Sequence, residues 1–300
     1  MIALVNPAAG GGTALEKWAR IEPHLRARTG PLDVHVTENP DDLARRVARA
    51  LGEGETRFIA AGGDGTVNAV LQSLVELTPA ALLNLIALGA VGLGSSNDFH
   101  KPNPLVIGGV PCRIGFGTAT RHDVGVLICV GPDGTPSTRY WLVNASIGAT
   151  AEANHFFNHP DRLLRFLKRR STSSGILYAA GRTLLRYRCR EMTLTLDDSI
   201  ETTVLTQNIG VVKNPHFAGS LHYDSPHEPD SGDFYVHRLE KVPPSRLVAA
   251  FAGLARGRFG GGRGTRSWRA RKLTVRNCGP FAVEFDGEVT IAGEATFCLH

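Results

Sequence analysis

The chain has 300 residues, which is long for one hydrophobic core, so we expect two domains. With 42% hydrophobic and 20% charged residues, its composition is that of ordinary globular proteins. The net charge of +5 favours anionic partners, which include nucleic acid, acidic membranes and phosphorylated ligands. No apolar run approaches the roughly 18 residues that a bilayer-spanning helix needs, so any membrane contact is expected to be peripheral.

The five cysteines are scattered, odd in number and never arranged as a CxxC pair. This pattern predicts reduced cysteines of a cytosolic protein and argues against a zinc site or a disulfide framework. The first residues form a short apolar run without a basic leader, which predicts a strand and not a signal peptide. We therefore expect a cytoplasmic protein.

The most informative segment is residues 58–71, where a short apolar run turns through Gly62, Gly63 and Gly65 and continues with helical spacing. This pattern predicts a strand, a tight turn and a helix. Glycines let a bound group approach the backbone, and the first N–H groups of a helix have no partner within it. The turn is therefore a candidate phosphate site, although glycine-rich turns also occur where nothing binds.

Two more predicted strands end in turns of the same kind. Residues 1–5 run into the glycines at 10–12, and residues 85–92 run into 93–99. In an open parallel sheet, turns at the carboxyl ends of the strands lie together, where ligands bind. Three such turns indicate one shared site.

The character of the chain changes near residue 124. Residues 1–123 alternate between strand and helix patterns, which predicts a Rossmann-like, three-layer α/β domain. Residues 124–288 contain many short β-rich runs separated by turns, which predicts an antiparallel β-sandwich. Helical inserts are expected at about 162–190 and 245–256.

The first insert is strongly basic, with nine Lys or Arg and no Asp or Glu between residues 162 and 190. A helical wheel over 176–190 places Arg182, Arg186 and Arg190 on one side. This arrangement predicts contact with an anionic membrane, and the alternative is a solvated helix face. Nucleic acid is not expected, because aromatic residues do not alternate with the basic ones.

Five motifs, in this order, resemble those of the diacylglycerol kinase catalytic-domain family, the soluble bacterial lipid kinases related to sphingosine kinases and, more distantly, to NAD kinases. NPAAG at residues 6–10 is similar to the family's NPxxG turn, and GGDGT at 62–66 to its signature. LGSSNDF at 93–99 is similar to LGTxNDF, and NASIG at 144–148 and DGE at 286–288 follow.

The resemblance implies an ATP- and Mg²⁺-dependent enzyme that transfers the γ-phosphoryl group to a lipid hydroxyl, such as that of a diacylglycerol or a sphingoid lipid. It implies that ATP binds between the α/β domain and the sandwich, and that residues 289–300 return to complete the first domain. The protein would associate peripherally with the inner face of the membrane. A homodimer is compatible with the sequence, which does not identify the lipid.

The same resemblance implies roles for individual residues. Asp286 corresponds to the general base that accepts the lipid hydroxyl proton, with Glu288 beside it. Asp64, Asp98 and, through water, Asp42 correspond to acids that organise Mg²⁺. The implied nucleotide-binding residues are Asn6, Gly10, Gly11, Gly12, Gly62, Gly63, Asp64, Gly65, Thr66, Ser95, Asn97 and Asp98.

The residues also allow other interpretations. Asp286 could be a turn residue, Asp98 part of a helix cap, and Asp42 a first-turn acid favoured by the helix dipole. Ala69 stands where the family usually has a glutamate, and Ser231 where its cation loop has a second aspartate. Two alternative functions follow: an NAD kinase-like enzyme, or a protein that binds nucleotide and membrane without catalysis.

Overall fold

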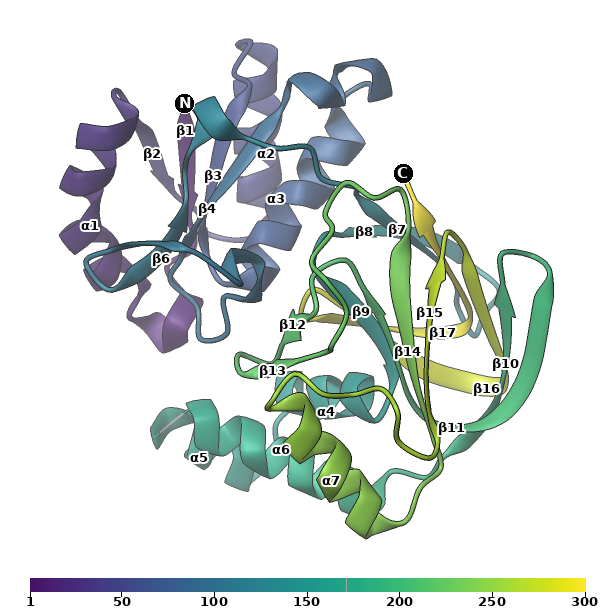
Figure 1. Cartoon of the computed structure of the whole chain (residues 1–300). Helices are drawn as coiled ribbons and strands as arrows, with labels where there is room; N and C mark the ends of the chain where they lie inside the picture. Colours follow the sequence, from purple (N-terminus) through teal and green to yellow (C-terminus); the bar gives the residue numbers. More distant parts are fainter. Residues whose placement is uncertain (171) are drawn as a thin grey trace. The chain divides into compact units, whose positions relative to one another are not determined.

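The structure is a computed structural model that describes residues 1–170 and 172–300 (Figure 1). The chain divides into two compact units, Met1–Arg121 and His122–His300, close to the boundary expected at residue 123. Residue 171, which falls within the predicted basic insert, lies outside the described residues.

The first unit is built on a six-stranded sheet with strand order β2-β1-β3-β4-β6-β5. The strands β1 to β4 are parallel, whereas β5 and β6 form an antiparallel pair beside β4. Its elements are β1 (Ile2–Val5), the 3-10 helix η1 (Ala9–Gly12), α1 (Ala14–Thr29), β2 (Asp33–Val36), α2 (Pro40–Gly52), β3 (Arg57–Gly62), α3 (Asp64–Leu77), η2 (Ala80–Leu85), β4 (Ala87–Gly92), η3 (Asp98–His100), β5 (Leu105–Ile107), β6 (Val110–Arg113) and η4 (Phe116–Thr118).

Helices cover both faces of this sheet (Figure 1). On one face, Trp18, Ile21 and Leu25 of α1 pack in one buried cluster with Ala3 and Val5 of β1, because alternate strand residues share a face. Figure 1 shows α2 and α3 on the other face. The predicted α/β arrangement is confirmed, and the carboxyl ends of β1, β3 and β4 lie at one edge.

The second unit is rich in antiparallel strands, as predicted, with helices between β9 and β10 and after β14. Its elements are β7 (Gly125–Val130), β8 (Pro136–Trp141), β9 (Asn144–Gly148), α4 (Ala149–Asn158), α5 (Arg162–Arg170), α6 (Thr172–Arg186), β10 (Arg190–Leu196), β11 (Ile200–Val212), β12 (His216–Phe217), β13 (Leu221–His222), β14 (Phe234–Glu240), α7 (Pro244–Leu254), β15 (Thr265–Ala270), β16 (Leu273–Phe285) and β17 (Glu288–Leu299).

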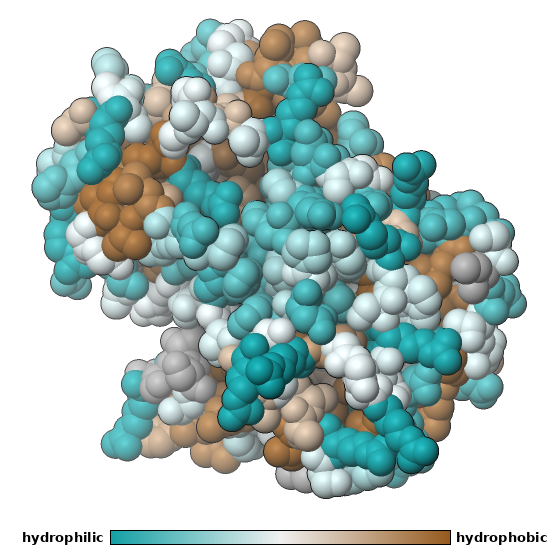
Figure 2. All heavy atoms as spheres, in the orientation of Figure 1, coloured by the Kyte–Doolittle hydropathy of each residue, from teal (hydrophilic) through white to brown (hydrophobic). Residues whose placement is uncertain are grey.

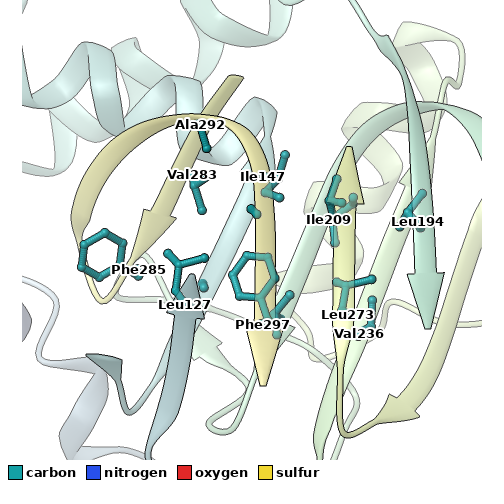
Figure 3. Packing of buried hydrophobic residues seen from close by; sticks show 14 of the residues in the cluster. Leu127, Ile147, Leu194, Ile209, Val236, Leu273, Val283, Phe285, Ala292 and Phe297 are labelled. Atoms are coloured by element: carbon teal, nitrogen blue, oxygen red, sulfur yellow. The ribbon is translucent and has the colours of Figure 1, made fainter. Parts of the chain in front are cut away.

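The main strands of this unit form one nine-stranded sheet, where we expected the two separate sheets of a sandwich. Both β9 and β10 pair with the two long strands β11 and β16, but with different halves of each. Irregular pairing within β11 and β16 divides these halves. Side chains from β7, β9, β10, β11, β14, β16 and β17 share one buried cluster (Figure 3).

The prediction that residues 289–300 return to the first domain is wrong. These residues belong to β17, which pairs with β16 on one side and with β7 on the other. Phe297 and Ala292 of β17 are fully buried in the core of the second unit (Figure 3). Such long-range strand pairing leaves no signal in a local sequence pattern.

The basic insert is not the single helix that the wheel assumed. It consists of α5, α6 and the start of β10, and α6 ends at Arg186. Arg190 is the first residue of β10 and donates a hydrogen bond to the carbonyl oxygen of Pro280. Arg182 lies over the ring of Phe156, with 4.1 Å from its guanidinium carbon to the ring centroid. The three arginines therefore do not form one exposed face.

Among the described residues, no helix is long and apolar enough to span a membrane.

Candidate functional site

The turn between β3 and α3 requires its glycines. A Cβ atom on Gly62 would lie 2.2 Å from the hydroxyl oxygen of Thr66, in the first turn of α3. Gly63 is the N-cap residue of α3, and the helix begins at Asp64. The N-terminal end of a 14-residue helix therefore lies against backbone that carries no side chains, which suits an anion.

The turn after β1 is joined to the same helix. Asn6 donates a hydrogen bond of 3.0 Å from its side-chain nitrogen to Oγ1 of Thr66, and its side-chain oxygen accepts one from the Ala8 amide. Gly10 has φ of +59°, and a Cβ atom there would lie 2.5 Å from the carbonyl oxygen of Leu93. Three glycines, at positions 10 to 12, have positive φ, which explains the run.

The turn after β4 is fixed by Asn97, which has a left-handed φ of 52°. Its side-chain oxygen accepts a hydrogen bond from the Gly94 amide, and its side-chain nitrogen donates to the carbonyl oxygens of Gly92 and Gly94. Gly94 lies against Gly63, since a Cβ on Gly94 would be 2.4 Å from the Gly63 Cα. The three predicted turns are therefore in direct contact. Ser95 is exposed beside them.

Two of the predicted acids lie next to each other in this site. The Asp64 side chain accepts a hydrogen bond of 3.0 Å from the amide of Phe99, the residue after Asp98. Asp98 is buried, and one of its carboxylate oxygens lies 2.5 Å from Nζ of Lys101. Lys101 partly neutralises this acidic pair.

Asp42 has a different environment. It is at the start of α2, after β2, and β1 separates β2 from β3 in the sheet. Its carboxylate accepts hydrogen bonds from the side chain of Arg46 and the amide of Glu38, and these interactions lower its pKa. Its contacts are those of a helix-start acid, which the sequence offered as the alternative.

The donor set of the first unit fits a magnesium nucleotide. Within the described residues, no group of three or more His, Cys, Asp or Glu could hold a metal ion by itself. Mg²⁺, however, is commonly held by one or two carboxylates together with water and substrate phosphates. Asp64 and Asp98 supply such a pair beside the glycine turns.

The DGE segment forms the tight turn between β16 and β17. Asp286 and Gly287 have φ of 46° and 93°, as a two-residue turn with two left-handed residues requires. The Asp286 carboxylate accepts three backbone hydrogen bonds, from the amides of Leu142, Val143 and Asn144, at 2.7, 2.9 and 3.1 Å. Its own amide donates to the carbonyl oxygen of Asn144.

These contacts give the two predicted catalytic carboxylates different environments. Asp286 is only 4% exposed and is held by three N–H donors, so its geometry is that of a residue that fixes the turn. Glu288, two residues later, is exposed. No sequence pattern pointed to the amides at 142–144, because they lie more than 140 residues from Asp286.

A buried histidine adjoins the turn after β4 and gives a pH prediction. Burial lowers the pKa of His100 to about 4, and that of His237 in the second unit to about 4, from an ordinary 6.5. Between pH 6.5 and 4, both histidines are protonated in the unfolded chain but remain neutral in the folded chain. The free energy of unfolding should therefore fall as pH falls through this window, by about 1.4 kcal/mol per pH unit for each histidine.

Urea unfolding between pH 7 and pH 4.5 tests this prediction. We expect the free energy of unfolding to fall less steeply with falling pH in His100→Gln and in His237→Gln. In His24→Gln, at an exposed site, it should fall as in wild type. An identical slope in all four proteins would contradict it.

Comparison with known proteins concerns mainly the first unit. Residues 1–104, which contain all three glycine turns, match the family model described as diacylglycerol kinase catalytic domain. These residues are therefore similar to that family. The predicted resemblance is thereby confirmed.

Curated relatives share part of the chain. A protein of Stenotrophomonas maltophilia named "Probable lipid kinase YegS-like" is 34% identical over 128 residues, or 42% of this chain and 39% of that protein. A protein of the same name from Xanthomonas euvesicatoria is 43% identical over 124 residues, or 41% of this chain and 38% of that protein. The aligned part thus spans about two fifths of these relatives' length.

Solved structures extend the likeness to the whole fold. A crystal structure described as a diacylglycerol kinase from Bacillus anthracis has a TM-score of 0.64 at 15% identity, covering 99% of this chain and 92% of that one. Another chain from the same organism gives a TM-score of 0.71 at 16% identity, covering 100% and 93%. At this identity the likeness concerns the fold alone.

Proposed function

We propose that this protein is a lipid kinase that transfers the γ-phosphoryl group of ATP to a lipid hydroxyl with the help of Mg²⁺. The observation that carries the proposal is the contact between three glycine-rich turns, with Asp64 and Asp98 beside them. Phosphoryl transfer depends mainly on positioning and on neutralising charge, and these turns offer both. The names of the curated relatives agree with this reaction class.

The residues of the first unit would bind and orient the nucleotide. The start of α3 supplies N–H groups to phosphate oxygens, and the glycines at 10–12 and 62–63 let the phosphates approach the backbone. Asp64 and Asp98 would hold Mg²⁺. When bound, the ion would offset the negative charge of the phosphates. Lys101 fixes the position of the Asp98 carboxylate.

We assign the proton-accepting role to Glu288 and a positioning role to Asp286. A general base must reach the hydroxyl proton, and Glu288 is the exposed carboxylate of the DGE turn. Asp286 ties that turn to the backbone at 142–144 and so fixes the place from which Glu288 projects. This assignment differs from the sequence prediction, which gave the base role to Asp286.

The choice of acceptor tests the function. The protein would be incubated with Mg²⁺ and γ-labelled ATP, with a panel of lipids in mixed micelles and with NAD in a parallel reaction. We expect label in a lipid and none in NAD. Label in NAD alone would favour the NAD kinase-like alternative. No label in any acceptor, with ATP binding intact, would favour a non-catalytic binding protein.

We further propose that α5 brings the protein to an anionic membrane. Leu164 anchors this helix and is fully buried, whereas Leu163 and Phe166 are about half exposed. At 100° per residue, these two side chains lie on one side with the exposed Arg162 and Arg170. Figure 2 shows apolar surface beside hydrophilic side chains in the lower part of the view, where Figure 1 places α5 to α7. Such a face suits a lipid headgroup layer.

Vesicle sedimentation tests this surface. Binding to vesicles with anionic lipid should weaken as salt rises, and Leu163→Ser with Phe166→Ser should reduce it at least tenfold. Leu82→Ser, at a similarly exposed leucine of the first unit, is the control and should bind as wild type does. Equal binding to neutral and anionic vesicles at every salt concentration would contradict the proposal.

A further inference from the structure

The ammonium group of Lys213 lies inside the second unit, directly after β11. Its side chain is 1% exposed. Nζ lies 2.7 Å from a carboxylate oxygen of Asp123, 3.0 Å from the hydroxyl oxygen of Ser231 and 2.7 Å from the carbonyl oxygen of Asp233. An ammonium group has three N–H donors, and these three oxygens accept all of them.

The surrounding loop is closed around this group. The same oxygen of Asp123 accepts a hydrogen bond from the Gly232 amide, and the Asp123 amide donates to the carbonyl oxygen of Pro229. Arg269 of β15 binds both carboxylate oxygens of Asp233, at 2.9 Å each. The loop at 228–233 is thus held to the first residues of the unit and to a strand of the sheet.

The oxygen set around Nζ has the chemistry of a hard-cation site, with a carboxylate, a hydroxyl and a backbone carbonyl. The family resemblance implies a cation loop here, with Ser231 in place of one carboxylate. A divalent ion does not fit these residues, because the Lys213 ammonium occupies the space between the three oxygens and already supplies positive charge.

We propose that Lys213 is the resident cation of this loop and that it replaces a divalent metal ion as the group that orders residues 228–233. The backbone at Lys213 also contacts the segment that holds the DGE turn. The amides of Lys213 and Asn214 both donate to the carbonyl oxygen of Val143, and the Val143 amide donates to Asp286. The segment that carries Lys213 is therefore hydrogen-bonded to the segment that holds that turn. The proposal does not depend on the proposed reaction.

Thermal unfolding of the second unit tests this role without any activity measurement. The chain has three tryptophans, so in a Trp18→Phe background the two that remain, Trp141 and Trp268, both report on the second unit. We expect the same melting temperature in EDTA as in millimolar Mg²⁺ or Ca²⁺. Lys213→Met should lower it by about 5–10 °C, because buried carboxylate and carbonyl oxygens lose their partner.

A second variant asks whether the oxygens can hold a metal once the ammonium is gone. In Lys213→Met with Ser231→Asp, we expect Mg²⁺ or Ca²⁺ to raise the melting temperature by several degrees and EDTA to reverse the rise. Lys272→Met removes an exposed lysine paired with Asp198 and should change the melting temperature by no more than about 2 °C.

Each outcome bears on the proposal. A fall in the melting temperature of the Trp18→Phe protein in EDTA, restored by Mg²⁺, would overturn it. An unchanged melting temperature in Lys213→Met would also overturn it. The same holds if neither Mg²⁺ nor Ca²⁺ raises the melting temperature of the double variant. If Lys213→Met does not fold, the comparison of EDTA with Mg²⁺ in the parent protein still decides.

Discussion

Replacing Gly94 with alanine is expected to weaken nucleotide binding at least tenfold. The new Cβ atom would lie 2.4 Å from the Cα of Gly63 and 3.1 Å from the side-chain oxygen of Asn97. Backbone cannot move aside as a flexible side chain can, so the turns after β3 and β4 must separate. We expect a loss of about 1–3 kcal/mol in stability and at least a tenfold weaker affinity for Mg²⁺ and ATP.

Calorimetric titration with ATP in Mg²⁺, together with urea unfolding, measures both effects. Gly52→Ala is the matched control, since nothing lies within 4 Å of a Cβ atom at that position in the same unit. It should bind ATP as wild type does. Wild-type affinity in Gly94→Ala would show that the contact between the two turns is unimportant for the nucleotide.

Glu288→Gln and Asp286→Asn should both lose phosphoryl transfer, but for different reasons. Glu288→Gln removes the proton acceptor from an exposed position, so kcat should fall by about 10² to 10⁴ while stability is unchanged. Asp286→Asn places an amide where three backbone N–H groups need acceptors. It should lower stability by about 2–4 kcal/mol as well as activity.

Kinetics and urea unfolding on the two variants separate these roles. ATP affinity should remain near the wild-type value in Glu288→Gln. If Asp286→Asn folds with wild-type stability and loses all transfer, while Glu288→Gln keeps full turnover, the base is Asp286 and our assignment is wrong.

The sequence was sufficient to predict that the three glycine turns of the first unit lie together. Within each turn the glycines are close together along the chain, and each turn follows a strand of one parallel sheet. Local patterns therefore identify the turns, and the sheet topology brings them together. The Gly63 to Gly94 contact and the Asn6 to Thr66 hydrogen bond follow from that topology. Asp42 was included only by resemblance, although its pairing with Arg46 has the i,i+4 spacing of neighbouring side chains on a helix.

The second unit was harder to predict, because its decisive contacts are distant in sequence. Asp286 and Glu288 are two residues apart and chemically alike, yet only pairing with the amides at 142–144 buries the first. Similarly, Arg190 continues a basic helical pattern but belongs to β10, whose pairing with β11 begins at that residue. Tertiary pairing overrides local periodicity in both cases.

The most direct test of the account is transfer of the γ-phosphate of ATP into extractable lipid by three proteins side by side: wild type, Glu288→Gln and Gly94→Ala. We expect labelled lipid from wild type at a far higher rate than from either variant, with ATP binding retained in Glu288→Gln and weakened at least tenfold in Gly94→Ala. Lipid labelled at the wild-type rate by Glu288→Gln and Gly94→Ala, or no labelled lipid from wild type, would contradict the account.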